Sequence, residues 1–238
     1  MKKAIVIYSG GMDSTTLLYD VISQGYEVFP VTFNYAQRHG MKELAAARQT
    51  IEYLESLGKL KAVNYKVVDV RSINQLLQGS ALTSDIDVPE GHYAQDNMKL
   101  TVVPNRNMIM LSLAIGYAVS KEAETVFFGA HAGDHFQYPD CRPEFIRQLS
   151  ELGKIANFVP VEVIAPYSDM DKGDIAIRGT ELNVDYTKSW TCYLGQDRPC
   201  LKCGACIERC QSFQKANRQD PLLTDAEWEL LVKNSNKF

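Results

Sequence analysis

The sequence predicts an α/β fold, a doubly wound parallel sheet that carries a small metal-binding module at its C-terminal end. Apolar runs rich in β-branched residues alternate with stretches of helical periodicity, an order typical of a parallel sheet covered by helices. Five of the six cysteines lie between residues 192 and 210, and such crowding indicates a metal site rather than a disulfide framework. We therefore expect a main domain over residues 1–187 and a cysteine module with a helical tail over residues 188–238.

Four strands and three helices are expected in the main domain. The strands are apolar runs that stop at a turn or a polar string, and the helices repeat apolar residues at helical spacing. We expect strands over 3–8, 27–33, 65–70 and 124–128, and helices over 14–23, 41–57 and 107–119. Residues 79–102 are polar and without periodicity, and so long a segment is either a lid over a site or a surface insertion without a role.

The bulk composition disfavours several classes of protein. A formal net charge of -4 lacks the basic excess that contact with a phosphate backbone requires, which disfavours nucleic acid as a partner. Two lysines and a short apolar stretch open the chain, but Gly10 and Asp13 follow too soon for a signal peptide, and no later apolar run approaches membrane-spanning length. We expect a cytoplasmic protein that does not bind membranes.

A glycine pair follows the first expected strand. Gly10 and Gly11 stand at the carboxyl end of that strand, where an open parallel sheet binds nucleotides, and they let phosphate oxygens approach the backbone. Ser9 and Ser14 add hydroxyl donors, and Ser14 or Asp13 is expected to cap the following helix. Asp13 is also expected to orient the loop or to meet magnesium. A glycine pair by itself is more often a plain turn, so the pair alone does not establish a phosphate site.

The string Ser9-Gly10-Gly11-Met12-Asp13-Ser14-Thr15 resembles the SGGxDS[ST] signature, called the PP-loop, of the N-type ATP pyrophosphatases. Members of that superfamily cleave ATP between its α and β phosphates, leave AMP on a substrate oxygen and release pyrophosphate. The resemblance implies that ATP is a substrate and that Ser9, Asp13 and Ser14 take part in catalysis. It also implies an ATP-binding segment made of Tyr8, Ser9, Gly10, Gly11, Met12, Asp13, Ser14, Thr15, Thr16, Leu17 and Leu18.

Polar strings also follow two other expected strands, and their residues should face the same crevice. One string spans 34–39 and the other spans 129–142, and both are dense in groups that pair with anions or aromatic rings. Asn105 precedes the helix at 107 and is expected to cap it. Which arginine would bind a substrate carboxylate stays open. The candidates for contact with a substrate are Arg38, Arg106, Asp134, Tyr138, Asp140 and Arg142.

The cysteine spacing indicates one tetrahedral metal ion. Cys200, Cys203 and Cys206 repeat the C-x-x-C spacing by which two thiolates hold one ion. The fourth ligand is either Cys192 or Cys210. The run that would include Cys210 is known from iron–sulfur proteins, but here it lacks their proline and a second cluster. We therefore favour a structural zinc ion held by Cys192, Cys200, Cys203 and Cys206.

The chain as a whole resembles the QueC family, 7-cyano-7-deazaguanine synthase. The matching strings are SGGMDSTT, VTFNYAQRH, VPNRN, YPDCR, Asp171-Lys172 and SWTCY with the cysteines that follow it. The resemblance implies a fold like that of the adenine nucleotide alpha hydrolases. It implies an ATP-dependent conversion of 7-carboxy-7-deazaguanine and ammonia to the 7-cyano base of queuosine biosynthesis, through an adenylated carboxylate and an amide. It also implies Cys192 as the fourth zinc ligand, Lys172 as a catalytic phosphate contact, and a homodimer.

Three alternatives remain open at this point. Phe136-Gln137 stands where the family commonly has Ser-Gly before YPDCR, so a related enzyme that stops at the amide is one of them. A PP-loop enzyme that adenylates a tRNA base is the second, with the cysteine module holding RNA. The third is a binding protein that keeps a nucleotide loop without catalysis.

Overall fold

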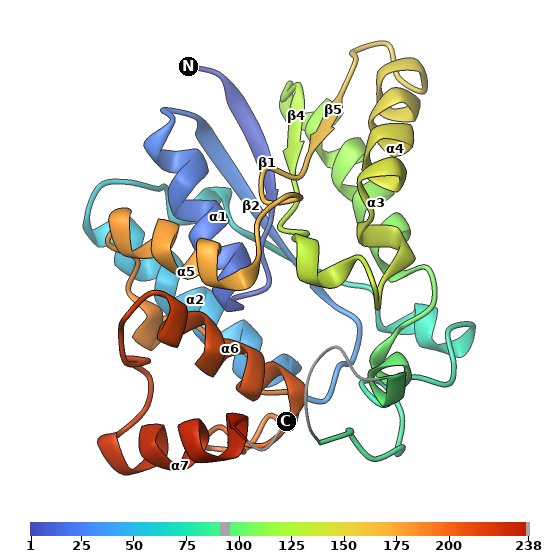
Figure 1. Cartoon of the computed structure of the whole chain (residues 1–238). Coiled ribbons are helices and arrows are strands. Elements are labelled where there is room, and N and C mark those ends of the chain that lie inside the picture. Colours follow the sequence, from blue (N-terminus) through green and yellow to red (C-terminus); the bar gives the residue numbers. More distant parts are fainter. Residues whose placement is uncertain (91–95, 237–238) are drawn as a thin grey trace.

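The structure, a computed structural model, describes residues 1–90 and 96–236, and in that part of the chain five parallel strands form one sheet (Figure 1). The strands are β1 (Lys3–Ile7), β2 (Glu27–Asn34), β3 (Lys66–Asp69), β4 (Thr125–Phe127) and β5 (Glu162–Ile164), in the spatial order β3-β2-β1-β4-β5. The order reverses at β1, because the chain moves outward to β3 on one side and later to β5 on the other. The carboxyl ends of the strands at such a reversal are where an open sheet binds its ligand.

Helices cover both faces of the sheet. They are α1 (Met12–Ser23), α2 (Gly40–Ser56), α3 (Arg106–Lys121), α4 (Pro143–Ile155), α5 (Lys172–Glu181), α6 (Gly204–Lys215) and α7 (Asp225–Ser235). Successive side chains of a strand point to opposite faces. Ala4 and Val6 of β1 accordingly pack with α1, α2 and α5, while Ile5 packs with α3 and α4. The predicted doubly wound α/β fold is confirmed. No helix within the described ranges is long and apolar enough to cross a membrane.

The seven predicted elements are present, with boundaries shifted by one or two residues. α4, β5 and α5 are not among the predicted elements. β5 is three residues long, which is too short for a periodic signal. α4 does carry a signal, because Pro143 stands at its first turn and its buried residues Ile146, Leu149 and Gly153 recur at helical spacing.

Asn105 stands at the N-cap position of α3 but does not cap it. Its backbone is left-handed, with φ 57°, and its side chain makes no capping hydrogen bond. Asp140 supplies the acceptor: its Oδ2 accepts the Asn107 amide at 3.0 Å, and its Oδ1 accepts Nδ2 of the same residue at 3.1 Å. The predicted cap is wrong because a carboxylate from a distant part of the chain takes its place.

The C-terminal helices are attached to the main sheet through α5, against which α6 packs (Figure 1). Arg209 of α6 is buried and donates from Nε and Nη2 to the two carboxylate oxygens of Asp220, at 2.6 and 2.8 Å. The Trp190 amide donates to the carbonyl of Gly10 at 2.9 Å. Residues beyond position 187 therefore contact the PP-loop directly.

The described part of the segment 79–102 is built into the fold. Ser80, Ala81 and Leu82 are buried, and so is Met98. Glu90 forms an isolated antiparallel bridge with Cys203 of the C-terminal module. Residues 91–95, in the middle of the segment expected to be either a lid or a surface insertion, lie outside the described residues.

Candidate active site

A cavity of ≈ 220 Å³ lies at the carboxyl end of the sheet, beside the point where the strand order reverses. Its wall combines the end of β1, the PP-loop, the start of α2, α3 and the C-terminal module. The predicted site residues that line it are Tyr8, Ser9, Gly11, Met12, Asp13, Ser14, Arg106, Asp134, Tyr138 and Lys172. Those that do not line it are Gly10, Thr15, Thr16, Leu17, Leu18, Arg38, Asp140 and Arg142.

The PP-loop is closed on itself by the hydroxyls of its two serines. Ser14 Oγ accepts the Ser9 amide at 3.2 Å and lies 3.0 Å from Ser9 Oγ, which accepts the Gly11 amide at 3.1 Å. Gly11 is the N-cap residue of α1, and no side chain caps the helix. The predicted cap by Ser14 or Asp13 is wrong, since both residues lie inside the first turn. The amides of that turn have no acceptor within the helix and suit phosphate oxygens.

Gly10 brings the PP-loop close to α2, and we expect Gly10→Ala to separate them. Gly10 has φ +90°, and a Cβ there would stand 2.6 Å from the carbonyl oxygen of Glu43 and 2.9 Å from the amide nitrogen of Ala47. The free energy of unfolding should fall by more than the roughly 1–2 kcal/mol of a left-handed alanine alone. Because the loop must move, ATP binding should weaken about tenfold or more.

Thermal unfolding and ATP titration measure these two effects. Gly25→Ala is the matched control, because Gly25 has φ +81° but open space around the position of a Cβ. The control should show the conformational cost without the loss of ATP binding. Equal effects of the two substitutions would contradict the role given to Gly10.

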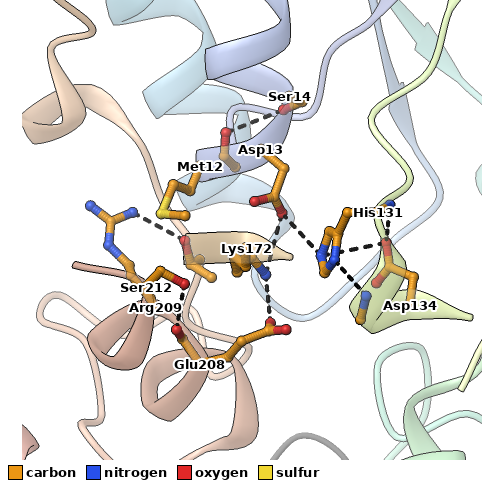
Figure 2. Close-up of polar contacts among 12 residues, drawn as sticks. Met12, Asp13, Ser14, His131, Asp134, Lys172, Glu208, Arg209 and Ser212 are labelled. Carbon is orange, nitrogen blue, oxygen red and sulfur yellow. Dashed lines mark hydrogen bonds and ion pairs between the residues drawn. The ribbon is translucent and has the colours of Figure 1, made fainter. Parts of the chain in front are cut away.

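Figure 2 shows Lys172 between carboxylates of two other helices. Its Nζ lies 2.6 Å from Glu208 Oε2 of α6 and 3.3 Å from Asp13 Oδ2 of α1. Asp13 Oδ2 also lies 3.9 Å from Nε2 of His131, whose Nδ1 accepts the Gly133 amide at 3.1 Å. Burial alone would lower the pKa of Lys172, but Asp13 and Glu208 raise it above its ordinary value. The lysine therefore keeps its positive charge at the wall of the cavity.

Arg106 is the predicted arginine that reaches the cavity. Its Nη1 donates to the hydroxyl of Tyr35 at 3.2 Å, and its guanidinium lies 5.7 and 5.8 Å from the ring centres of Tyr35 and Tyr138. No carboxylate of the described residues forms an ion pair with it. Arg38 and Arg142 are exposed and donate to backbone carbonyls outside the cavity.

The first turn of α2 and the string before it supply three cavity residues that are not among the predicted substrate contacts. Gln37, His39 and Glu43 line the cavity. Burial alternates along the string, since Tyr35, Gln37 and His39 are buried while Arg38 is exposed. The backbone here is a turn and not a strand, since Ala36 has φ 61° and the Gly40 amide donates to the Gln37 carbonyl. No periodic signal in the sequence therefore identifies these residues.

The four predicted metal ligands lie together. The Sγ atoms of Cys192, Cys200, Cys203 and Cys206 are all within 4.8 Å of one another. Cys203 and Cys206 are 3.6 Å apart at sulfur, and Cys200 and Cys206 are 3.9 Å apart. Zinc–sulfur bonds of about 2.3 Å in a tetrahedron place neighbouring sulfurs about 3.8 Å apart, so the cluster fits zinc. Cys210 lies outside the group as a buried free thiol.

Comparison with known proteins assigns the chain to a family. The profile described as "Queuosine biosynthesis protein QueC" matches residues 3–217. The chain belongs to the QueC family. The "7-cyano-7-deazaguanine synthase" of Hahella chejuensis is 55% identical over 92% of this chain and 92% of that relative. The protein of the same name from Pseudoalteromonas translucida is 51% identical over 93% of this chain and 98% of the relative. Among solved structures, NMN synthetase from Francisella tularensis has a TM-score of 0.48 and is 12% identical, over 99% of this chain and 84% of that chain. This likeness is too distant to inform the chemistry.

Phe136 and Gln137, which differ from the Ser-Gly expected from the resemblance, lie outside the cavity. Phe136 is exposed, with Nζ of Lys99 5.8 Å from its ring centre. Gln137 is buried, and neither residue lines the cavity. The departure therefore changes no side chain of the cavity wall.

Proposed function

We propose that this QueC chain uses ATP to convert 7-carboxy-7-deazaguanine and ammonia to 7-cyano-7-deazaguanine in queuosine biosynthesis. One observation carries the proposal: a single cavity joins the PP-loop to Arg106, an arginine that forms no ion pair at contact distance with a carboxylate of the described residues. A guanidinium of this kind binds a carboxylate through two parallel hydrogen bonds. The names of the relatives and the position of Phe136 favour neither an enzyme that stops at the amide nor a tRNA-modifying enzyme.

In the proposed reaction the same substrate carbon is activated twice. Its carboxylate oxygen, positioned by Arg106, attacks the α phosphorus of ATP, and pyrophosphate leaves. The amides at the start of α1, the hydroxyls of Ser9 and Ser14 and the ammonium of Lys172 stabilise the charge on the phosphates. Ammonia then displaces AMP to give the amide. A second ATP activates the amide oxygen, and loss of AMP and of both amide protons gives the nitrile.

Two metal ions fit the residues present. Asp13 Oδ1 is buried without a hydrogen-bond partner among the described residues, and a carboxylate oxygen of this kind suits the magnesium that accompanies ATP. The four thiolates leave no open coordination position, so the zinc ion would be structural. It would shape the module that brings Trp190, Thr191 and Tyr193 to the cavity.

We propose that Asp134 and Tyr138 contact the substrate, because both line the cavity, and that Asp140 acts through the α3 terminus that it caps. We further propose a cytoplasmic homodimer whose protomer divides into a main domain over 1–187 and a zinc module over 188–238. Size-exclusion chromatography with light scattering tests the dimer.

Mass spectrometry of the products tests the proposed function. Incubation of the intact protein with 7-carboxy-7-deazaguanine, ammonium and ATP should yield the nitrile, with AMP and pyrophosphate released at each activation. Accumulation of the 7-amide without nitrile would refute nitrile synthesis. Stimulation of pyrophosphate release by tRNA in place of the free base would favour the tRNA-modifying enzyme instead.

Arg106→Met is expected to weaken the use of the carboxylate substrate. Loss of a charged hydrogen-bond donor costs about 1.5–3 kcal/mol, which corresponds to a fall in kcat/KM of roughly 10- to 100-fold. Arg142→Met is the matched control, because Arg142 is exposed and outside the cavity. Steady-state kinetics with varied concentrations of the substrate acid compare the two variants. A larger fall in kcat/KM for Arg142→Met would mean that Arg106 is not the arginine that binds the carboxylate.

A further inference from the structure

The proposed reaction removes all three protons of ammonia from its nitrogen, and no residue assigned so far accepts them. When ammonia adds to the acyl adenylate, its nitrogen must lose a proton before the amide is complete. The nitrogen loses a second proton when the amide oxygen is adenylated, and the last N–H proton must leave together with AMP as the nitrile forms. One proton acceptor at the cavity wall would serve each of these steps. The inference that this acceptor is a catalytic residue rests on the proposed function.

His39 has a buried nitrogen without a partner at the cavity wall. The residue lines the cavity and is 3% exposed. Its Nε2 lies 3.5 Å from Oε2 of Glu43, four residues later in α2. Its Nδ1 is buried and makes no hydrogen bond with any residue of the ranges 1–90 and 96–236. With the ring proton on Nε2, toward the carboxylate, the Nδ1 lone pair is open to accept a proton.

The surroundings of His39 fix its orientation. Gln37 Nε2 donates to Glu43 Oε2 at 2.9 Å and so holds the carboxylate that faces the imidazole. The ring of Tyr193, from the C-terminal module, lies against the imidazole with 5.5 Å between ring centres. Gly195 lies so close to the backbone of His39 that a Cβ on residue 195 would stand 2.8 Å from the His39 Cα. An imidazole oriented by a carboxylate and held by packing is the usual arrangement of a general base.

Several other titratable groups of the wall are paired or stay protonated. Asp13 and Lys172 form an ion pair, and Asp134 Oδ2 accepts a backbone amide at 3.2 Å. Burial raises the pKa of the Cys141 thiol and of the Tyr8 hydroxyl, so both keep their protons. Nδ1 of His39 is an acceptor that none of these interactions occupies.

We propose that His39 is the general base of both amide and nitrile formation, and that Glu43 orients it. As the nitrogen of ammonia bonds to the acyl carbon, Nδ1 accepts one of its protons and the C–O bond to AMP breaks. In the second cycle Nδ1 accepts one amide N–H proton when the amide oxygen is adenylated, and then the remaining N–H proton as the C–O bond to AMP breaks. The electron pair of that last N–H bond becomes the third bond of the nitrile. Between these transfers His39 passes each proton to water.

His39→Ala is expected to keep adenylation and to lose the steps that follow it. ATP–pyrophosphate exchange with the substrate acid measures adenylation and should stay within about threefold of the intact protein, since the PP-loop and Lys172 are unchanged. Amide and nitrile formation, followed by mass spectrometry, should fall by ~10²–10⁴-fold. Imidazole added to the solution should restore about tenfold or more of the lost rate, which a damaged fold would not allow.

Two further variants separate catalysis from structure. Glu43→Gln should slow the same two steps by a smaller factor and leave exchange unchanged, because a neutral amide still accepts from Gln37 but no longer attracts the Nε2 proton. His135→Ala is the matched control, because His135 lies outside the cavity, and all its rates should be unchanged.

Two results would overturn the role of His39. One is product formation by His39→Ala within about threefold of the intact protein. The other is a parallel loss of exchange and product that imidazole does not relieve. If the intact protein forms neither amide nor nitrile, the proposed function itself fails, and the inference fails with it.

Discussion

Replacing Cys203 with serine is expected to release the metal ion, to disorder the C-terminal module and to abolish nitrile formation. Cys203 is 2% exposed and is also the N-cap residue of α6. Structural zinc contributes its binding free energy to folding, so loss of one of four thiolates removes much of what holds a small module together. The module supplies Trp190 and Tyr193 to the cavity wall, and the site is therefore incomplete without it.

Metal analysis of the purified proteins gives the first measurement, with about one zinc ion per chain expected before the substitution and none after it. Thermal unfolding and product assays give the others. Cys210→Ser is the matched control, because that thiol is equally buried but contacts a serine hydroxyl of α7 at 3.8 Å instead of the cluster. Loss of metal from the control, or iron and sulfide in the intact protein, would overturn the assignment of zinc to the four predicted cysteines.

The fold could be predicted from the strands that are buried on both faces. β1 and β2 are continuous apolar runs because helices cover them on either side. β5 has three residues, two of which are not fully buried, so its sequence does not differ from that of a loop. The N-terminus of α3 is capped by Asp140, which is distant in sequence. The local sequence therefore predicts the wrong capping residue, Asn105.

The site could be predicted as far as its residues are adjacent in sequence. Ser9 to Ser14 form one string, and the cysteines share one spacing. Glu208 has no such signal, because it meets Lys172 only when α6 packs against α5. His39 lies within a string that the sequence analysis does single out, but its importance depends on which side of that string faces the cavity.

Replacing Lys172 with methionine is expected to reduce adenylation by ~10²–10³-fold, the usual effect of removing a charge that stabilises a transition state. Lys172 is the cation that faces both Asp13 of the PP-loop and Glu208 of α6. Its removal leaves two partly buried carboxylates without it, so the free energy of unfolding should also fall by roughly 1–3 kcal/mol. ATP–pyrophosphate exchange and thermal unfolding measure the two effects separately.

Two comparisons decide whether Lys172 acts on ATP or only on its neighbours. Lys215→Met removes an exposed lysine that pairs with Asp171 and Asp174 beside the same helix start. Exposed ion pairs contribute only about 0–1 kcal/mol to the free energy of unfolding. The double variant with Glu208→Gln removes one of the two carboxylates that Lys172→Met leaves without the lysine. The free energy of unfolding should then recover in part while exchange stays low, because methionine cannot bind phosphate. Recovery of both together would mean that Lys172 serves the packing of α6 and not the chemistry of ATP.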